Sequence, residues 1–111
     1  MFYMAEITGY AYGKLREYMK DNFKVIAIAN GTETVKKYTD ATITIENEKV
    51  KYKVIADNAD GSLTGKKVDR FAIYETATST DKIAEDAFAE FTYTNTNDTL
   101  TIEIELVIPS N

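Results

Sequence analysis

The acidic side chains of this chain include candidates for acid–base catalysis. Glu103 and Glu105 stand two positions apart, and Glu85, Asp86 and Glu90 precede them. Two carboxyl groups across a cleft, one of them in an apolar pocket, would act as the acid and base of glycoside hydrolysis. Glu103 and Glu105 instead alternate with apolar residues, which is typical of the solvated side of an amphipathic strand. We therefore expect a polar surface at this position rather than a catalytic cleft.

A stripe of lysines shows the same alternation. Lys49, Lys51 and Lys53, the lysine stripe, are separated by apolar residues and therefore share one face of a strand. If this strand neighbours the strand of Glu103 and Glu105, the opposite charges pair across the sheet. Each exposed ion pair would then contribute only ~0.2–1 kcal/mol to stability.

The loop at residues 57–61 has side chains of the kind that bind calcium. Residues 57–61 read Asp-Asn-Ala-Asp-Gly, and calcium loops need carboxylate and amide oxygens beside a glycine turn. With Gly61 at the sixth position of an EF-hand loop, Ala56 and Lys67 occupy the first and twelfth positions, which should be acidic. The pattern fails at its two strongest ligands, so we expect an ordinary turn of Asx and Gly residues.

The residues that follow share only their composition with a phosphate-binding loop. Gly61 and Gly65 are spaced G-x-x-x-G, and Lys67 stands where a P-loop has Ser or Thr. A helical pattern does not follow. We therefore expect no nucleotide site here.

The 111 residues contain neither cysteine nor histidine. This excludes disulfides, thiolate chemistry, Cys/His zinc sites and mechanisms with an imidazole base. The net charge of −5 argues against broad binding to a phosphate backbone. We expect no cofactor, no metal and no nucleic-acid partner.

Four aromatic residues in predicted strands could form a stacking platform for single-stranded nucleic acid. They are Tyr52, Phe71, Tyr74 and Tyr93. The lysine stripe lies on the opposite strand face from Tyr52, so charges and rings do not interleave. We expect these rings to pack in the core.

One helix is expected over residues 8–22. Tyr12, Leu15 and Met19 recur at the i, i+3, i+7 spacing of a helical face, and Thr8 is a suitable N-cap. Two glycines inside the segment weaken the helix by up to ~1 kcal/mol each relative to alanine. The helix should therefore depend on docking against another surface.

About seven strands follow, because the hydrophobic period changes to two after the helix. Asn30-Gly31 predicts a hairpin turn between the first two strands. Residues 83–87 are ambiguous between a helical turn and an extended segment. The expected strands cover residues 24–29, 32–38, 41–46, 49–56, 68–76, 88–94 and 99–108.

Short strands separated by turn signals indicate a sandwich or barrel rather than βαβ units. We therefore expect a mainly β (α+β) fold, an antiparallel β-sandwich of about seven strands with one N-terminal α-helix. The chain 1–111 is expected to be one domain, with an extension at 1–7, the helix at 8–22 and the sandwich at 24–108. No stretch approaches the ~18–20 consecutive apolar residues of a membrane span.

Two segments together carry a family resemblance. Residues 7–28 begin Ile-Thr-Gly-Tyr-Ala-Tyr-Gly and end Lys-Val-Ile-Ala-Ile. Residues 71–76 read Phe-Ala-Ile-Tyr-Glu-Thr, and Asp-Thr-Leu-Thr-Ile at 98–102 leads to Ile-Pro at 108–109. In outline this resembles the small structural proteins of tailed bacteriophages, over most of the chain. It departs from them at residues 78–81, Thr-Ser-Thr-Asp, where that group often has paired glycines.

The resemblance implies a non-enzymatic virion structural protein of a tailed phage or prophage, acting in the head, neck or tail by homo-oligomeric assembly. The implied partners are other copies of the chain and other virion proteins, with no nucleic acid and no membrane. The implied location is the virion, assembled in the host cytoplasm. No catalytic residues carry over from such a family.

Apolar residues on the helix and the last two strands are the candidates for the interface. Phe88 and Phe91 are expected on opposite faces of their strand, and Val107 on the polar side of the last strand. The expected interface residues are Tyr12, Leu15, Met19, Phe88, Phe91 and Val107.

The alternative function is a soluble β-sandwich binding module for carbohydrate or protein. Such a module would be a monomer with exposed tyrosines, and the candidates are Tyr3, Tyr10, Tyr38 and Tyr93. A small hydrolase with a carboxylate pair is a third hypothesis, and it would need two acidic residues in one cleft.

Overall fold

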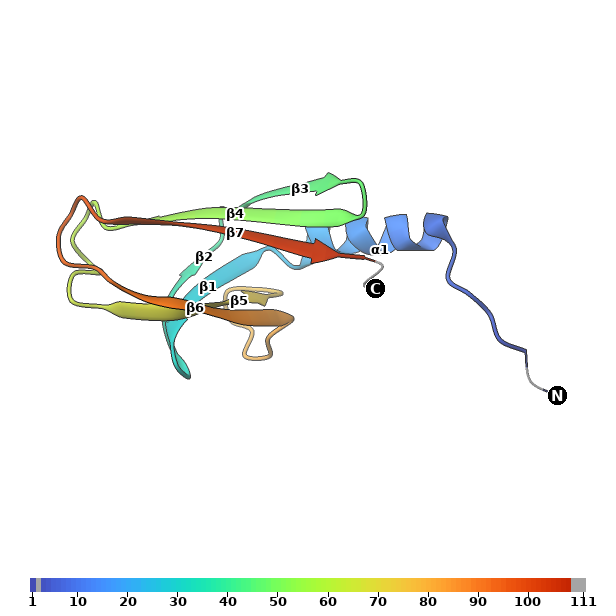
Figure 1. The fold of residues 1–111 in the computed structure, drawn as a ribbon, viewed down its shortest axis with the longest axis horizontal. Coiled ribbons are helices and arrows are strands. Elements are labelled where there is room, and N and C mark those ends of the chain that lie inside the picture. The colour runs from blue at the N-terminus through green and yellow to red at the C-terminus, as the bar shows by residue number, and fades with distance from the viewer. Residues whose placement is uncertain (2, 109–111) are drawn as a thin grey trace.

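The structure, a computed structural model, describes Met1 and residues 3–108. Its seven strands form two antiparallel sheets, ordered β2-β1-β5-β6 and β3-β4-β7, which are stacked as two layers (Figure 1). The predicted mainly β sandwich with one N-terminal helix is confirmed. The elements are α1 (Gly9–Asn22), β1 (Val25–Asn30), β2 (Glu33–Tyr38), β3 (Thr42–Glu46), β4 (Lys49–Asp57), β5 (Lys67–Tyr74), β6 (Ala84–Thr92) and β7 (Thr99–Val107).

Two tight turns set the first hairpins. Gly31 has a φ of 58° between β1 and β2, and Asn47 has a φ of 57° between β3 and β4. Glycine and asparagine are the residues that adopt this left-handed conformation most readily. The predicted Asn30-Gly31 hairpin is confirmed, and the ambiguous residues 83–87 belong mostly to β6, which begins at Ala84.

The main core lies between the inner faces of the two sheets. Ile26 and Ile28 from β1 meet Val50, Tyr52 and Val54 from β4, and all five are at most 4% exposed. Burying such a side chain fully contributes about 1.5–3 kcal/mol. The alternation of β4, with lysines outward and apolar residues inward, therefore fixes its register against the opposite sheet.

The central strand β1 is also buried on its outer face. Val25 and Ala27 are 4% and 1% exposed there and cluster with Ala72 and Tyr74. The Lys37 ammonium group on β2 donates hydrogen bonds to loop carbonyls that follow β5. Because β1 lies between β2 and β5, the Lys37 side chain extends over β1, and its ammonium group lies 4.2 Å from the centre of the Tyr74 ring on β5. This explains why β1 reads as a continuous apolar run.

A register shift changes the faces of β6. Val68 pairs with Phe91, but Arg70 pairs with Ala87, so β6 carries extra residues opposite Asp69. Such a bulge breaks the strict alternation of a strand. Phe88 and Phe91 consequently both pack against the main core. The prediction that they lie on opposite faces is wrong for this reason.

The molecule is long for its size. Its principal extents are 62 × 26 × 25 Å and its radius of gyration is 16.4 Å, against about 13 Å for a compact domain of this length. The excess comes from α1 and from the N-terminal arm (residues 1–7), of which residues 3–7 project beyond the sandwich (Figure 1).

Candidate assembly surface

Helix α1 is defined at both ends by hydrogen bonds. The Thr8 hydroxyl oxygen accepts a hydrogen bond from the Ala11 amide at 3.2 Å, as an N-cap does. At the other end, the Phe23 amide donates to the Met19 carbonyl at 2.9 Å, and the Asn22 side chain donates to the Tyr18 carbonyl. The predicted cap and end of the helix are confirmed.

Only the C-terminal part of α1 docks on the sandwich. Met19 and Phe23 pack against the main core, and the Tyr52 hydroxyl donates to the Met19 carbonyl at 3.5 Å. Arg16 donates to the backbone carbonyl of Ile108, so the end of β7 lies beside the middle of the helix. Tyr12 is half-buried, and none of the helix residues is buried.

Other apolar side chains of α1 are exposed to solvent. Leu15 is 46% exposed, Tyr18 54% and Tyr10 75%. The N-terminal arm adds Tyr3 at 88% and Ile7 at 56%. Exposed apolar side chains gathered at one end of a molecule, as on α1 and the arm (Figure 1), are typical of an interaction site.

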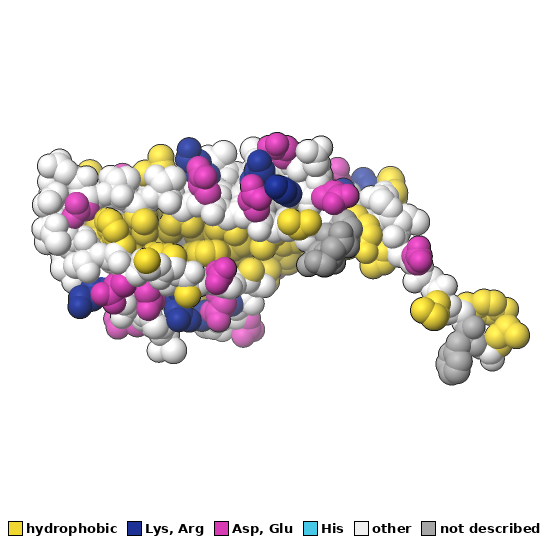
Figure 2. Space-filling model, in the orientation of Figure 1, with side chains coloured by type: hydrophobic (Ala, Val, Ile, Leu, Met, Phe, Trp, Pro, Cys, Tyr) yellow, Lys and Arg dark blue, Asp and Glu magenta, His cyan; other side chains and the backbone are white. Residues whose placement is uncertain are grey.

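A second apolar surface lies between the edges of the two sheets. Figure 2 shows a hydrophobic band between the layers, along β6 and β7. Part of this band is a groove of about 340 Å³. The groove residues are Phe71, Phe88, Ala89, Leu100, Thr101, Ile102 and Glu103.

The six predicted interface residues fall into three places. Met19 packs on the core and Tyr12 is half-buried, whereas Leu15, predicted on the same helical face, is 46% exposed. Phe88 and Phe91 border the band between the sheets, where Phe91 stacks edge-on against Tyr93 at 4.9 Å. Val107 is 42% exposed on the polar face of β7, opposite Lys49, as its position in the strand predicts.

Sequence reasoning missed the contribution of Phe71 and Leu100 to the groove, and of the arm to the exposed surface. Phe71 and Leu100 have the alternation of ordinary core residues, so their spacing gives no sign of partial exposure. Their partial exposure follows from the four-stranded sheet facing a sheet of only three strands. The high apolar content of residues 1–7 is the signal that was available for the arm.

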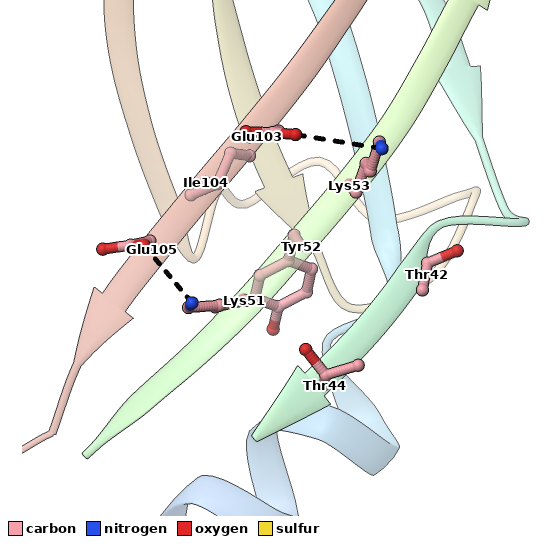
Figure 3. Close-up of a pocket in the computed structure, with 8 residues that line it drawn as sticks. All are labelled: Thr42, Thr44, Lys51, Tyr52, Lys53, Glu103, Ile104 and Glu105. Carbon is pink, nitrogen blue, oxygen red and sulfur yellow. Dashed lines mark ion pairs between the residues drawn. The ribbon is translucent and has the colours of Figure 1, made fainter. Parts of the chain in front are cut away.

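The outer face of the three-stranded sheet is polar and charge-paired. Lys51 lies opposite Glu105 and Lys53 opposite Glu103 in the β4–β7 ladder. Their Nζ to carboxylate distances are 3.8 Å and 3.9 Å, and the pairs border a shallow hollow with threonine on its other side (Figure 3). The predicted solvated face is confirmed.

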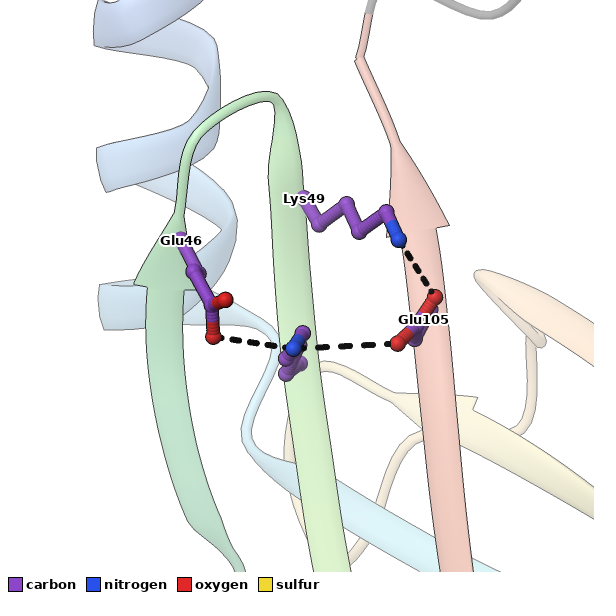
Figure 4. A network of polar contacts seen from close by, with 4 residues as sticks. Glu46, Lys49 and Glu105 are labelled. Carbon is purple, nitrogen blue, oxygen red and sulfur yellow. Dashed lines mark hydrogen bonds and ion pairs between the residues drawn. The ribbon is translucent and has the colours of Figure 1, made fainter.

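The network continues across all three strands (Figure 4). Lys51 Nζ lies 2.8 Å from a Glu46 carboxylate oxygen, and Lys49 Nζ lies 3.1 Å from Glu105. The hydrogen bond from Lys51, and then its charge, lower the pKa of Glu46. These exposed pairs align the strands and place no carboxyl group in an apolar pocket, which an acid catalyst of glycoside hydrolysis would need.

The loop that invited a calcium interpretation is organised by hydrogen bonds. Asn58 is fully buried; its Oδ1 accepts from the Leu63 amide at 2.8 Å. Its Nδ2 donates to Thr64 Oγ1 at 2.9 Å and to the Asn95 carbonyl at 3.0 Å. Within Met1 and residues 3–108, no group of three or more acidic residues is placed to hold a metal ion.

The aromatic strand residues serve the core, as expected. Tyr52 and Tyr93 are at most 1% exposed and Tyr74 is 5% exposed. Burial raises the pKa of Tyr52 and of Tyr93 to about 12. The alternative binding module would need Tyr93 exposed, and this part of the alternative is wrong, because the Tyr93 ring is fully buried between the sheets.

No family model, curated protein or solved structure matches the chain. The helix that the structure describes is too short and too polar to cross a membrane.

Proposed function

We propose that this chain is a non-enzymatic structural protein that assembles with other copies of itself. We further propose that it belongs to the head, neck or tail of a tailed phage or prophage virion, where other virion proteins are its partners. The phage assignment rests on the resemblance of residues 7–28 and 71–109 alone. The assembly role rests on the geometry of the helix, the arm and the open side of the sandwich.

The observation that carries the proposal is the set of apolar side chains that the fold leaves uncovered on α1 and the arm. The helix has apolar groups on two sides, and only one side meets the sandwich. Leu15, Tyr18 and Tyr10 remain about half to three-quarters exposed. Exposed apolar surface is costly in water at roughly 25 cal/mol per Å². A second copy that covers both this surface and the arm would recover that free energy.

A binding module receives less support from the same residues. Its tyrosines should form a solvent-facing platform on a sheet, but Tyr93 is buried and Tyr38 is half-buried. The exposed tyrosines, Tyr3 and Tyr10, lie on the arm and the helix instead of the sheets. This distribution favours contact with a neighbouring copy.

Native mass measured by light scattering over a concentration series tests the proposal. The chain has a mass of 12.5 kDa, and we expect the wild type to reach a defined multiple of it. A variant with Leu15→Ser and Tyr18→Ser should dissociate at least ~10-fold more readily, since every 1.4 kcal/mol of lost contact is a factor of ten.

The matched control carries Lys14→Ser and Glu17→Ser, which change the exposed i, i+3 ion pair of the same helix. We expect this control to associate like the wild type. A wild-type chain that remains a monomer at every concentration would overturn the proposal. Equal association of the two variants would show that the outer side of α1 is not part of the interface.

A further inference from the structure

Resting on the proposed function, we infer that the N-terminal arm of one copy docks on a second copy. The arm adds as an extra strand beside β7 and covers the groove between β7 and β6. The occupant is the arm of a neighbouring chain, with residues 3–7 in the extended course that they take in the structure (Figure 1). In this arrangement, the arm and the groove form the contact between neighbouring copies.

The groove exists because the two sheets differ in strand number. One sheet has four strands and ends at β6, while the other has three and ends at β7. The groove is lined by Phe71 of β5, Phe88 of β6 and Leu100 of β7, so β7 lies over β5 and the inner face of β6 is left open. Phe88, Phe91 and Leu100 are consequently only half-buried, although they pack on the core. A fourth strand beside β7 would cover β6.

The backbone of β7 is also ready for another strand. In the described part of the chain, β7 is hydrogen-bonded in a ladder to β4 alone, and β6 to β5 alone. An edge strand presents unpaired N–H and C=O groups along its free side. Adding an extended segment to such an edge is an established mode of recognition, with backbone hydrogen bonds for affinity and alternate side chains for specificity.

The arm has the composition and conformation that this edge requires. It is extended and contributes no backbone hydrogen bonds over residues 3–7. Alternate side chains of a strand face opposite ways, so Tyr3, Ala5 and Ile7 share one side, and Glu6 lies on the other. The side with Tyr3 and Ile7 is uncharged. We therefore assign that side to the groove.

Length argues for a second copy. Arg16 is level with the end of β7, and Thr8 lies two helical turns further out, about 12 Å at ~1.5 Å per residue. An arm of seven residues spans at most ~25 Å. If the arm folded back onto the sandwich of its own chain, about half of its length would be needed to reach the end of β7. Glu103, at the near end of the groove, lies about 13 Å further along the strand at ~3.3 Å per residue, and Leu100 lies about 23 Å further. An arm in its own chain therefore reaches at most the near end of the groove and cannot lie along it.

Disulfide trapping tests the contact. Because the sequence contains no cysteine, only the introduced thiols can form disulfides. The Tyr3→Cys chain is mixed with the Ala89→Cys chain, because Ala89 is exposed and lines the groove. The control mixture replaces Ala89→Cys by Thr44→Cys, which lies exposed on β3 in the other sheet. Each single-cysteine chain can bond only to another chain.

We expect the groove mixture to form the mixed disulfide about 10²-fold faster than the control mixture, since docking raises the effective concentration of the two thiols. Equal rates in an oligomeric sample would overturn the arm contact and leave the proposed assembly intact. A sample that stays monomeric would overturn the proposed function itself. Efficient bonding within a monomeric Tyr3→Cys, Ala89→Cys double variant would show that the arm docks on its own chain, which also contradicts the inference.

Discussion

The side-chain amide of Asn58 donates a hydrogen bond of 3.0 Å to the backbone carbonyl of Asn95. This contact joins the loop after β4 to the turn between β6 and β7, at the end of the sandwich away from the helix. The Asn58 amide nitrogen also donates to Thr64, and its oxygen accepts from Leu63. One buried side chain thus organises both connections at this end.

Replacing Asn58 by alanine should lower the free energy of unfolding by about 2–3 kcal/mol, because several buried polar groups lose their partner at once. Urea unfolding followed by tyrosine fluorescence measures the change. The control is Asn97→Ala, at an exposed position in the neighbouring turn, which should cost under about 0.5 kcal/mol. Equal losses in the two variants would remove the structural role assigned to Asn58.

Tyr93 offers a test of the core between the sheets. Its hydroxyl donates to the Ala56 carbonyl at 2.7 Å, and its ring is fully buried. Tyr93→Phe should therefore cost about 1 kcal/mol, whereas Tyr10→Phe, on the exposed side of α1, should have no measurable effect on the urea midpoint. An unchanged midpoint in Tyr93→Phe would contradict the hydrogen bond.

Alkaline pH should destabilise the fold through the buried tyrosines. Burial raises the pKa of Tyr93 to about 12, whereas an unfolded tyrosine ionises at about 10. The unfolded state therefore loses its proton first, so the free energy of unfolding falls as the pH rises from about 10 towards 12. Urea unfolding across this range should show a smaller decline in Tyr93→Phe than in the wild type. An equal or steeper decline would contradict burial of the phenol.

Asp98 should make stability depend on acidic pH. Its Oδ2 accepts hydrogen bonds from the amides of Thr94 and Asn95 and from the Thr94 hydroxyl, and these lower its pKa from 3.8. A folded pKa below the unfolded one stabilises the fold above the unfolded value, and this contribution disappears as the pH falls through the folded value. The stability gap between wild type and Asp98→Asn should therefore be full near neutral pH and shrink below pH 3.8. Asp81→Asn, at an exposed loop position, is the control. A gap independent of pH would contradict this account.

The arm provides a prediction with an internal control, since its two sides should differ. Tyr3→Asp places a charge on the side assigned to the groove, and Met4→Asp places the same charge on the opposite side. Desolvating that charge should weaken association at least ~10-fold in Tyr3→Asp and much less in Met4→Asp. Sedimentation velocity at matched concentrations measures both. The reverse order would mean that the other side of the arm docks.

The regular part of the fold follows from local signals in the sequence. The lysine stripe and the apolar residues between its members fix the two faces of β4, and Asn30-Gly31 fixes the first hairpin. The sequence predicts the pairing of Lys51 with Glu105 only if their strands are neighbours, because strand order depends on contacts between residues far apart in the chain. The helical spacing predicts Leu15 as an interface candidate, and the polar side of the last strand predicts Val107; both are exposed.

The rest depends on features that have no local pattern. The register shift opposite Asp69 turns Phe88 and Phe91 to the same side. The regular alternation of a strand does not predict such a shift. The residues next to Tyr93 in the sequence are polar and give no sign of burial. Its ring is buried because it lies between the two sheets. The open face of β6 results from four strands facing three, which is a property of the whole sandwich.

Hydrogen exchange of the unmodified chain, measured from dilute to concentrated solution, tests most directly the claim that another copy covers the surface left open by the fold. The account predicts that amides of residues 3–7 exchange freely in dilute solution. It also predicts that these amides and those on the free edge of β7 become protected together as the concentration rises. An arm and a β7 edge that exchange equally fast at every concentration would contradict it.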